Sequence, residues 1–219
     1  MYQKPSHLGA QRTVSVPWQD FAIAPDVCLS TVDPQTTVVA VGAGGVARGS
    51  IVTDDAGTRQ ATLFFPPGTQ AQLVMPDGNT QPATHLTVHA TEYTVGPNGP
   101  LAMPAELPPT SAYTYAVEFT ADDFAAAGAT EVRFSAPVYA YVKNFLAMPV
   151  GLVVPSGSYA HDRGAWMAED NGRVIKILGI TNGAADLDTD GSGIAADATE
   201  LLALGLTDGQ ATPPSGKPR

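Results

Sequence analysis

Short alternations of hydrophobic and polar residues, interrupted by proline and glycine, run through most of the chain. The clearest example spans residues 61 to 65, where Ala61, Leu63 and Phe65 fall on one face of an extended segment. A period of two residues is typical of a half-buried strand. The Pro-Pro-Gly sequence that follows Phe65 cannot continue such a strand, so the pattern predicts a strand that ends there.

Similar runs recur along the chain and are separated by turn sequences such as Pro-Asp-Gly. The Asp-Asp-Ala-Gly turn at residues 54 to 57 predicts a hairpin. Only residues 122 to 129 and 198 to 204 have the pattern of short helices. We expect strands at residues 36–41, 50–53, 58–65, 71–75, 86–94, 112–120, 131–142, 151–154, 164–167 and 173–180.

These strands predict an all-β fold built from two tandem antiparallel β-sandwich modules, because the regular spacing of turns suits a sandwich. The modules are expected at residues 36–130 and 131–181, after an N-terminal arm or edge strand at residues 1–35. An acidic loop and short helix are expected at residues 182–208. Residues 209–219 are rich in proline and polar residues and are expected to be a disordered tail.

The charge balance excludes several partners. Eleven basic and twenty-one acidic residues give a net charge of −10 at pH 7, which repels nucleic acid and anionic lipid surfaces. No apolar run predicts a signal peptide or membrane insertion. The single cysteine, Cys28, cannot form an internal disulfide.

The acidic loop carries the most specific chemical motif. Its aspartates occupy positions 1, 3, 5 and 12 of a calcium loop, with Gly191 at the sharp bend of position 6 and a backbone carbonyl at position 7. Oxygen ligands at this spacing suit a hard cation. We therefore predict a Ca²⁺ site formed by Asp186, Asp188, Asp190, Ser192 and Asp197.

The loop departs from the usual calcium motif in two respects. Gly193 stands at position 8, where an apolar residue is usual, and an aspartate rather than a glutamate closes the loop. A single loop of this kind should bind weakly, with a dissociation constant on the order of 10⁻⁴ to 10⁻³ M. The alternative is a solvated loop whose four carboxylates repel one another.

Other motifs give weaker signals. Residues 42 to 47 read Gly-x-Gly-x-x-Ala, but no helix is predicted after them to bind a pyrophosphate. His85 and His89 lie on one predicted strand, roughly 13 Å apart at about 3.3 Å per residue, which is too far for one metal ion. No nucleophile motif is present in the sequence, so a non-enzymatic protein is expected.

The aromatic residues leave a second possibility open. Exposed aromatic side chains could form a platform for carbohydrate, although on strands they more often fill the core or its rim. The candidates are Trp18, Tyr93, Tyr113, Tyr115, Tyr139, Tyr141, Tyr159 and Trp166. A carbohydrate- or protein-binding β-sandwich module is therefore the alternative function.

Several segments together carry a resemblance to a known family. They are the run from Gly49 through Phe-Phe-Pro-Pro-Gly-Thr, Thr91-Glu-Tyr-Thr-Val-Gly, Leu107-Pro-Pro-Thr-Ser-Ala-Tyr and Val150-Gly-Leu-Val-Val-Pro-Ser-Gly-Ser-Tyr. The chain resembles, over about residues 36 to 208, the non-repetitive region that precedes the repeats of bacterial Rhs/YD-repeat proteins. The Phe-Pro-Pro-Gly-Thr step and the Phe-x-x-Pro-Val strand at residues 134–138 more weakly resemble the β-sandwich of ankyrins and netrin receptors.

The Rhs/YD resemblance implies a large extracellular or cell-surface protein in which this region is a non-catalytic structural or adhesive segment. Its partners would be the remainder of that larger protein, another surface protein or a glycan. The chain departs from the family at its ends, because it has no YD repeats and its tail abandons the pattern. We therefore expect no toxin activity from this chain.

Overall fold

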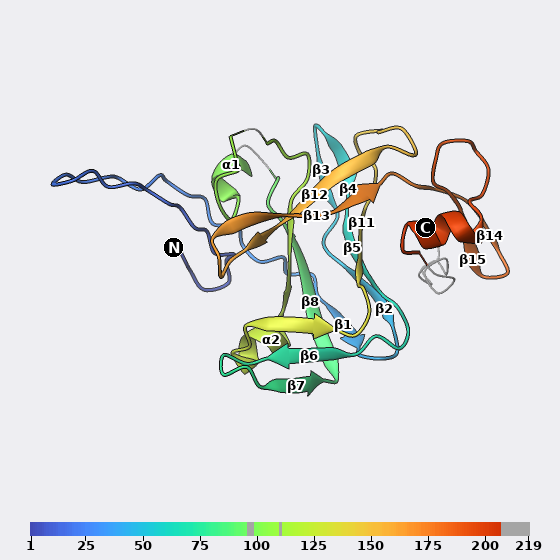
Figure 1. Ribbon diagram of the computed structural model, residues 1–219, viewed down its shortest axis with the longest axis horizontal. Coiled ribbons are helices and arrows are strands. Elements are labelled where there is room, and N and C mark those ends of the chain that lie inside the picture. Colours follow the sequence, from blue (N-terminus) through green and yellow to red (C-terminus); the bar gives the residue numbers. More distant parts are fainter. Residues whose placement is uncertain (96–98, 110, 207–219) are drawn as a thin grey trace.

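The computed structural model describes residues 1–95, 99–109 and 111–206, and these residues are mainly strands (Figure 1). Strands make up 40% of the structure and helices 7%, so the all-β class is confirmed. The predicted tail at residues 209–219 lies outside the described residues. No helix among the described residues is long and apolar enough to cross a bilayer.

The described elements are short. The strands are β1 (Thr37–Ala40), β2 (Gly45–Arg48), β3 (Val52–Asp54), β4 (Gly57–Arg59), β5 (Ala61–Phe65), β6 (Ala71–Val74), β7 (Thr80–Ala83), β8 (His85–Glu92), β9 (Val117–Ala121), β10 (Glu131–Phe134), β11 (Tyr139–Val142), β12 (Val153–Ala160), β13 (Ala165–Arg173), β14 (Lys176–Thr181) and β15 (Ala184–Asp188). The helices are α1 (Gly99–Ala102), α2 (Asp122–Ala127) and α3 (Ala198–Ala203).

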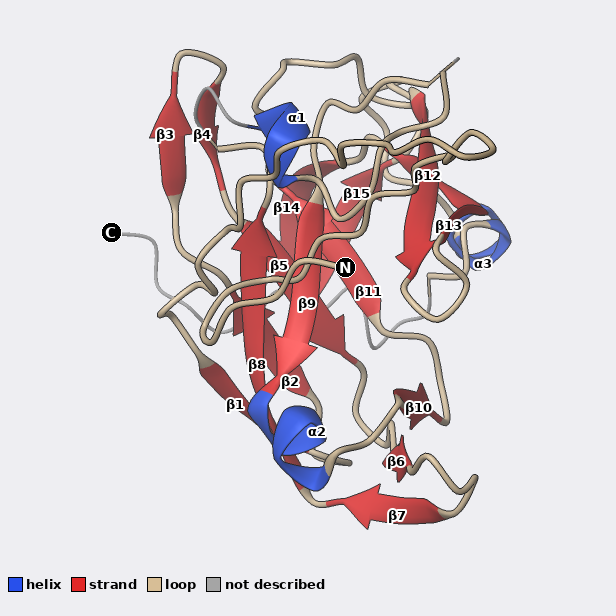
Figure 2. Cartoon of the chain, turned by 90° about the vertical axis from the view of Figure 1, so that its left-hand side faces the viewer, coloured by secondary structure: helices blue, strands red, loops and turns tan. Residues whose placement is uncertain are grey.

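Three small antiparallel sheets surround the main hydrophobic core (Figure 2). Their strand orders are β1-β8-β9, β11-β5-β2 and β10-β6-β7. Successive side chains of a strand point to opposite faces, so each strand turns every second residue toward this core. β5 shows the predicted alternation, because Ala61, Leu63 and Phe65 are all buried. The buried core residues are Val39, Ala47, Leu63, Phe65, Ala71, Leu73, Leu86 and Val88.

The predicted boundary between residues 130 and 131 falls inside this layered body. β10 pairs with β6 and β11 pairs with β5, so the chain from residue 131 to 142 completes sheets that earlier strands began. The ring of Phe134 packs edge-on against Phe65 at 5.9 Å between centroids. β10 and β11 therefore belong to the same layered body as the earlier strands. Local pattern could not predict this, because it depends on long-range strand pairing.

The residues after Val142 form two separate two-stranded hairpins, β12-β13 and β14-β15. Residues 156–158 and 169–172, which fall between the expected strands, lie within β12 and β13. Both strands are largely exposed, so the hairpin accepts polar residues and glycine where a buried strand would not. The described part of the chain thus shows one layered core followed by hairpins.

The N-terminal residues lie outside the sheets as an arm. Two isolated bridges, Tyr2 with Ala10 and His7 with Thr31, hold it in shape. Leu8 is buried beside Tyr93 and forms with it a second, smaller apolar cluster. The loop at residues 13–27 projects far from the rest of the molecule (Figure 1).

Candidate functional site

The acidic loop is organised around Asp188, a residue that is only 2% exposed to solvent. One carboxylate oxygen accepts the backbone N–H groups of Asp190 and Gly191 at 3.2 and 2.7 Å, and the other accepts that of Gly193 at 2.9 Å. A carboxylate that accepts three backbone N–H groups fixes the curl of the loop. Asp188 lies at the end of β15, a strand that sequence analysis assigned to the loop.

The other four predicted ligands have separate local roles. Asp186 accepts the Thr181 hydroxyl at 2.8 Å across the β14-β15 hairpin. Asp190 accepts the backbone N–H of Ser192 at 2.9 Å, and hydrogen bonds from Ser192 hold the pKa of Asp190 below its usual value. Asp197 caps α3 by accepting two backbone N–H groups of the helix, and Glu200 completes the capping box.

These side chains do not converge in the described residues, which contain no group of three His, Cys, Asp or Glu residues placed to hold a metal ion. A carboxylate has about four lone-pair sites, and Asp188 uses three of them on backbone N–H groups. Binding of calcium would therefore require Asp186, Asp190 and Asp197 to turn toward Asp188. The calcium site stays a prediction.

The most buried ionic cluster of the described residues centres on Arg59, whose side chain is 2% exposed. Its guanidinium donates to both oxygens of Asp54 at 2.7 Å and to Glu92 at 2.7 Å. These bonds raise the pKa of Arg59, and the bond from Arg59 lowers the pKa of Asp54 from 3.8 to about 2. The cluster ties the β3-β4 hairpin to the end of β8.

Aromatic rings cover the same cluster. The Arg59 guanidinium lies 4.8 Å from the centre of the Phe145 ring, and Tyr115 packs edge-on against that ring. Burial is the main cause that raises the pKa of the Tyr115 phenol, and Glu92 adds to it. Sequence analysis missed this cluster, although Arg59 is the single Lys or Arg between Gly49 and Val132.

The two histidines of β8 each face an aspartate of α2. His85 lies 3.0 Å from Asp123, and His89 lies 3.0 Å from Asp122. The other ring nitrogen of His89 is 2.8 Å from the carbonyl oxygen of Asp33. The histidines thus join β8 to α2 and to the N-terminal arm.

The aromatic candidates are divided between packed and exposed positions. Tyr93 is 3% exposed, and Trp166 packs against the second apolar cluster and donates to the Glu106 carbonyl at 3.0 Å. The tyrosines 113, 115, 139, 141 and 159 are half-buried. Trp18, by contrast, is 90% exposed on the projecting loop.

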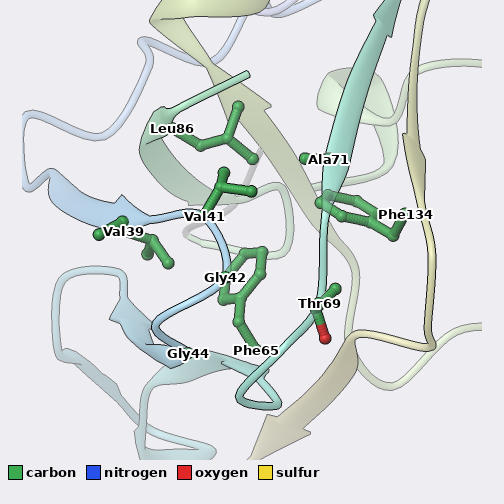
Figure 3. A pocket seen from close by; sticks show the side chains of 10 residues that line it. Val39, Val41, Gly42, Gly44, Phe65, Thr69, Ala71, Leu86 and Phe134 are labelled. Atoms are coloured by element: carbon green, nitrogen blue, oxygen red, sulfur yellow. The ribbon is translucent and has the colours of Figure 1, made fainter. Parts of the chain in front are cut away.

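The enclosed cavity in Figure 3 is small and apolar. It measures about 10 Å³ and lies between β1, β5 and β6, where the side chains of Val39, Phe65 and Leu86 line it. The Thr69 hydroxyl is buried there and has no hydrogen-bond partner among the residues that the structure describes. A space of this size holds about one water molecule. A larger, open hollow lies on the surface along residues 131–138.

The fold and these clusters define a mainly β protein whose buried charges join separate parts of the chain. Comparisons with protein-family models, with curated proteins and with solved structures found no match for this sequence.

Proposed function

We propose that the chain is a non-catalytic structural or adhesive segment of a bacterial surface or secreted protein of the Rhs/YD-repeat type. The observation that carries the proposal is the Arg59 cluster, in which a buried cation is fully used in joining β3-β4 to β8. Groups used in this way are not free to act on a substrate. The proposed location at the cell surface or outside the cell comes from the resemblance to the region that precedes the Rhs/YD repeats.

A second polar tie supports the same interpretation. The Asp33 carboxylate accepts the backbone N–H and the hydroxyl of Ser50, each at 2.6 Å. The backbone N–H of Asp33 in turn donates to the Thr91 hydroxyl at 2.9 Å. Three segments distant in sequence meet at this aspartate, which is the arrangement a rigid spacer requires.

The architecture proposed for this function is a tandem one. Residues 37–142 would form one sandwich-type module, and the hairpins after Val142 would stack beside it as a second.

The surface location can be tested by treating intact cells that express the native protein with protease. Release of peptides from residues 36–208 is expected, whereas peptides found only after lysis would contradict the proposal.

Calcium binding at the acidic loop belongs to the same proposal. The spacing of the aspartates along the loop supports it. Titration calorimetry should show a dissociation constant on the order of 10⁻³ M. At tenfold excess over that constant, calcium should stabilise the fold by about 1.4 kcal/mol. Thermal melting in calcium and in chelator measures this effect.

Two variants sharpen the calcium test. Asp190→Asn removes an exposed predicted ligand and should abolish both the heat and the shift in melting temperature. Asp77→Asn, in the exposed turn between β6 and β7, is the control and should leave both unchanged. Absence of binding heat together with an unchanged melting temperature would contradict the calcium site.

The alternative is a carbohydrate- or protein-binding module, and the exposure of Trp18 favours it. A glycan array distinguishes the two functions. The structural proposal expects no glycan to bind. Reproducible binding that Trp18→Ser abolishes would favour the alternative instead.

A further inference from the structure

The projecting loop, residues 13–27, exposes an unusual amount of apolar surface. Its large hydrophobic side chains are exposed by 38% to 90%; they are Val14, Val16, Trp18, Phe21 and Ile23. The two aromatic side chains alone present roughly 300 Å². An apolar surface of a few hundred Å² on a soluble protein usually marks an interaction site.

The base of the loop is firmly attached to the body. The backbone N–H of Gln11 donates to the Pro104 carbonyl at 2.6 Å, and that of Cys28 donates to the Leu101 carbonyl at 3.1 Å. The Arg12 guanidinium also donates to the Leu101 carbonyl, at 3.0 Å. Both limbs therefore leave the body at the same place, beside α1.

Most backbone groups in the limbs of the loop have no partner among the described residues. Between Arg12 and Val27, one hydrogen bond joins two backbone groups, from Asp20 to Pro17 at 3.3 Å in the terminal turn. In addition, the backbone N–H of Phe21 donates to the Asp20 carboxylate at 2.8 Å, and the Pro25 carbonyl accepts the Tyr2 hydroxyl at 2.9 Å. Val14 and Val16 in one limb, like Phe21 and Ile23 in the other, are two residues apart and so share a face when extended. Each limb thus resembles an unpaired strand with one apolar face.

A strand edge without a backbone partner among the described residues lies at the other end of the molecule. Within residues 1–95, 99–109 and 111–206, β14 pairs only with β15, and the outer side of β15 is partly covered because Leu187 accepts the backbone N–H of Ala196. β14 exposes Ile177, Leu178 and Ile180 by 58%, 39% and 59%. Figure 1 shows the projecting loop and the β14-β15 hairpin on opposite sides of the molecule.

We propose that the projecting loop of one copy pairs, as an added strand, with the free edge of β14 in a second copy. Strand addition would pair the backbone groups of both segments and bring their apolar side chains into contact as cross-strand neighbours on the same face of the extended sheet. The charges of the two paired segments are opposite, because the loop carries Asp20 and Asp26 and no Lys or Arg. β14 begins at the exposed Lys176 and follows Arg173.

The pairing joins two different surfaces, so the contact is heterologous. Each copy offers one loop and one edge, and the copies therefore assemble head to tail into rings or open chains. The proposal goes beyond the structural role given above and does not depend on it. If the protein proved monomeric, the proposed structural role would still stand. If it assembled but was not at the cell surface, the assembly proposal would still stand.

Sedimentation of the full chain over a range of concentrations tests the proposal. We expect the average mass to rise above the 22.6 kDa of the monomer as concentration increases. The double variant Trp18→Ser/Phe21→Ser should remain monomeric, as should Ile177→Lys/Ile180→Lys, which places charge on the edge strand. Ile51→Ser, at a side chain 67% exposed elsewhere, is the control and should assemble like the parent chain.

Mixing the two double variants gives the decisive result. The edge variant retains an intact loop and the loop variant retains an intact edge, so the mixture should form a dimer of about twice the monomer mass. Failure of the mixture to dimerise would overturn the proposal, because it excludes loop-to-edge pairing. A parent chain that stays monomeric throughout, or binds phosphatidylcholine vesicles through Trp18 without self-association, would also overturn it.

Discussion

Arg59 illustrates how a single charged residue can organise several segments of this chain. Its side chain is almost fully buried, and its partner Glu92 is only 6% exposed. A charge in such a position is tolerated because every donor direction meets a carboxylate, a carbonyl or an aromatic face. Removal of the cation would leave the buried Glu92 carboxylate without a counter-charge, although it would still accept the Thr94 hydroxyl.

Arg59→Met should therefore reduce the free energy of unfolding by about 3 kcal/mol, since breaking one side of a buried pair leaves an uncompensated charge. Urea denaturation at pH 7 measures the change. Arg133→Met is a matched control, because Arg133 pairs with Glu131 at an exposed site and should change the free energy by less than about 1 kcal/mol. Equal effects of the two substitutions would show that burial does not matter at Arg59.

The same cluster has a defined response to acid. The pKa of Asp54 is lowered in the folded state, so its ion pair contributes full stability above pH 3.8 and loses it as the pH falls through about 2. Asp54→Asn should flatten this acid limb of the stability profile. Melting temperatures measured from pH 1.5 to pH 5 check the prediction, and parallel profiles for both proteins would contradict it.

Thr69 is the opposite case, a buried hydroxyl that no group in the described part of the chain pairs with. Thr69→Val has nearly the same shape and removes the unsatisfied group, so stability should be unchanged or rise by about 1 kcal/mol. Thr91→Val is the control, because the Thr91 hydroxyl accepts the backbone N–H of Asp33. Its loss should cost about 1 to 3 kcal/mol in a denaturation measurement. A larger loss at Thr69 than at Thr91 would contradict this account.

At the scale of elements, the β12-β13 hairpin is attached to the body by side chains rather than by a shared sheet. Tyr159 donates to the side chain of Gln11, and Gln11 donates to the His161 carbonyl at 3.1 Å. The His161 ring lies 3.5 Å from Glu118 on β9. Of these polar contacts, the pair of His161 with Glu118 depends on protonation.

The attachment of this hairpin should weaken as the pH rises. The bond to Glu118 raises the pKa of His161 above its usual value of 6.5. The charged pair is therefore fully formed below pH 6.5 and is lost as the pH rises through the higher folded-state value. Hydrogen exchange of β12 and β13 between pH 6 and pH 9, corrected for intrinsic exchange, should show protection falling with pH. His161→Gln should remove this dependence, and an unchanged profile in that variant would contradict the assignment.

The elements that sequence could predict are those with a buried, alternating face. β5, β6 and β8 were predicted because their apolar residues repeat every second position. β15 was missed because Asp186 and Asp188 give a strand the composition of a loop. The helix after the acidic loop was predicted, but the role of Asp197 as its cap competes with its predicted role as a metal ligand.

The Arg59 cluster shows what the sequence pattern could not predict. Asp54 lies near Arg59 in the chain, but Glu92 and Phe145 reach it only through the fold. The isolation of Arg59 from other basic residues was the available signal, and it does not identify partners. Local pattern therefore predicted the strands of this protein better than the contacts that join them.

At the scale of the whole molecule, β8 connects the two apolar clusters. Leu86 and Val88 belong to the main core, whereas Tyr93 directly follows the strand and belongs to the second cluster with Leu8 and Met103. Because one continuous segment contributes side chains to both clusters, disruption of the packing in one cluster should also destabilise the other. The arm, the layered body and the second cluster are thus expected to unfold together.

Trp166 provides a probe of this coupling because it packs against the second cluster. In a Trp18→Phe background it is the sole tryptophan, and its fluorescence should change at the same urea concentration as the circular dichroism of the strands. Leu86→Ala, in the distant main core, should cost about 2 to 5 kcal/mol and move both transitions equally. If Trp166 kept its original midpoint while the circular dichroism shifted, the two clusters would be independent folding units, and β8 would join them without coupling them.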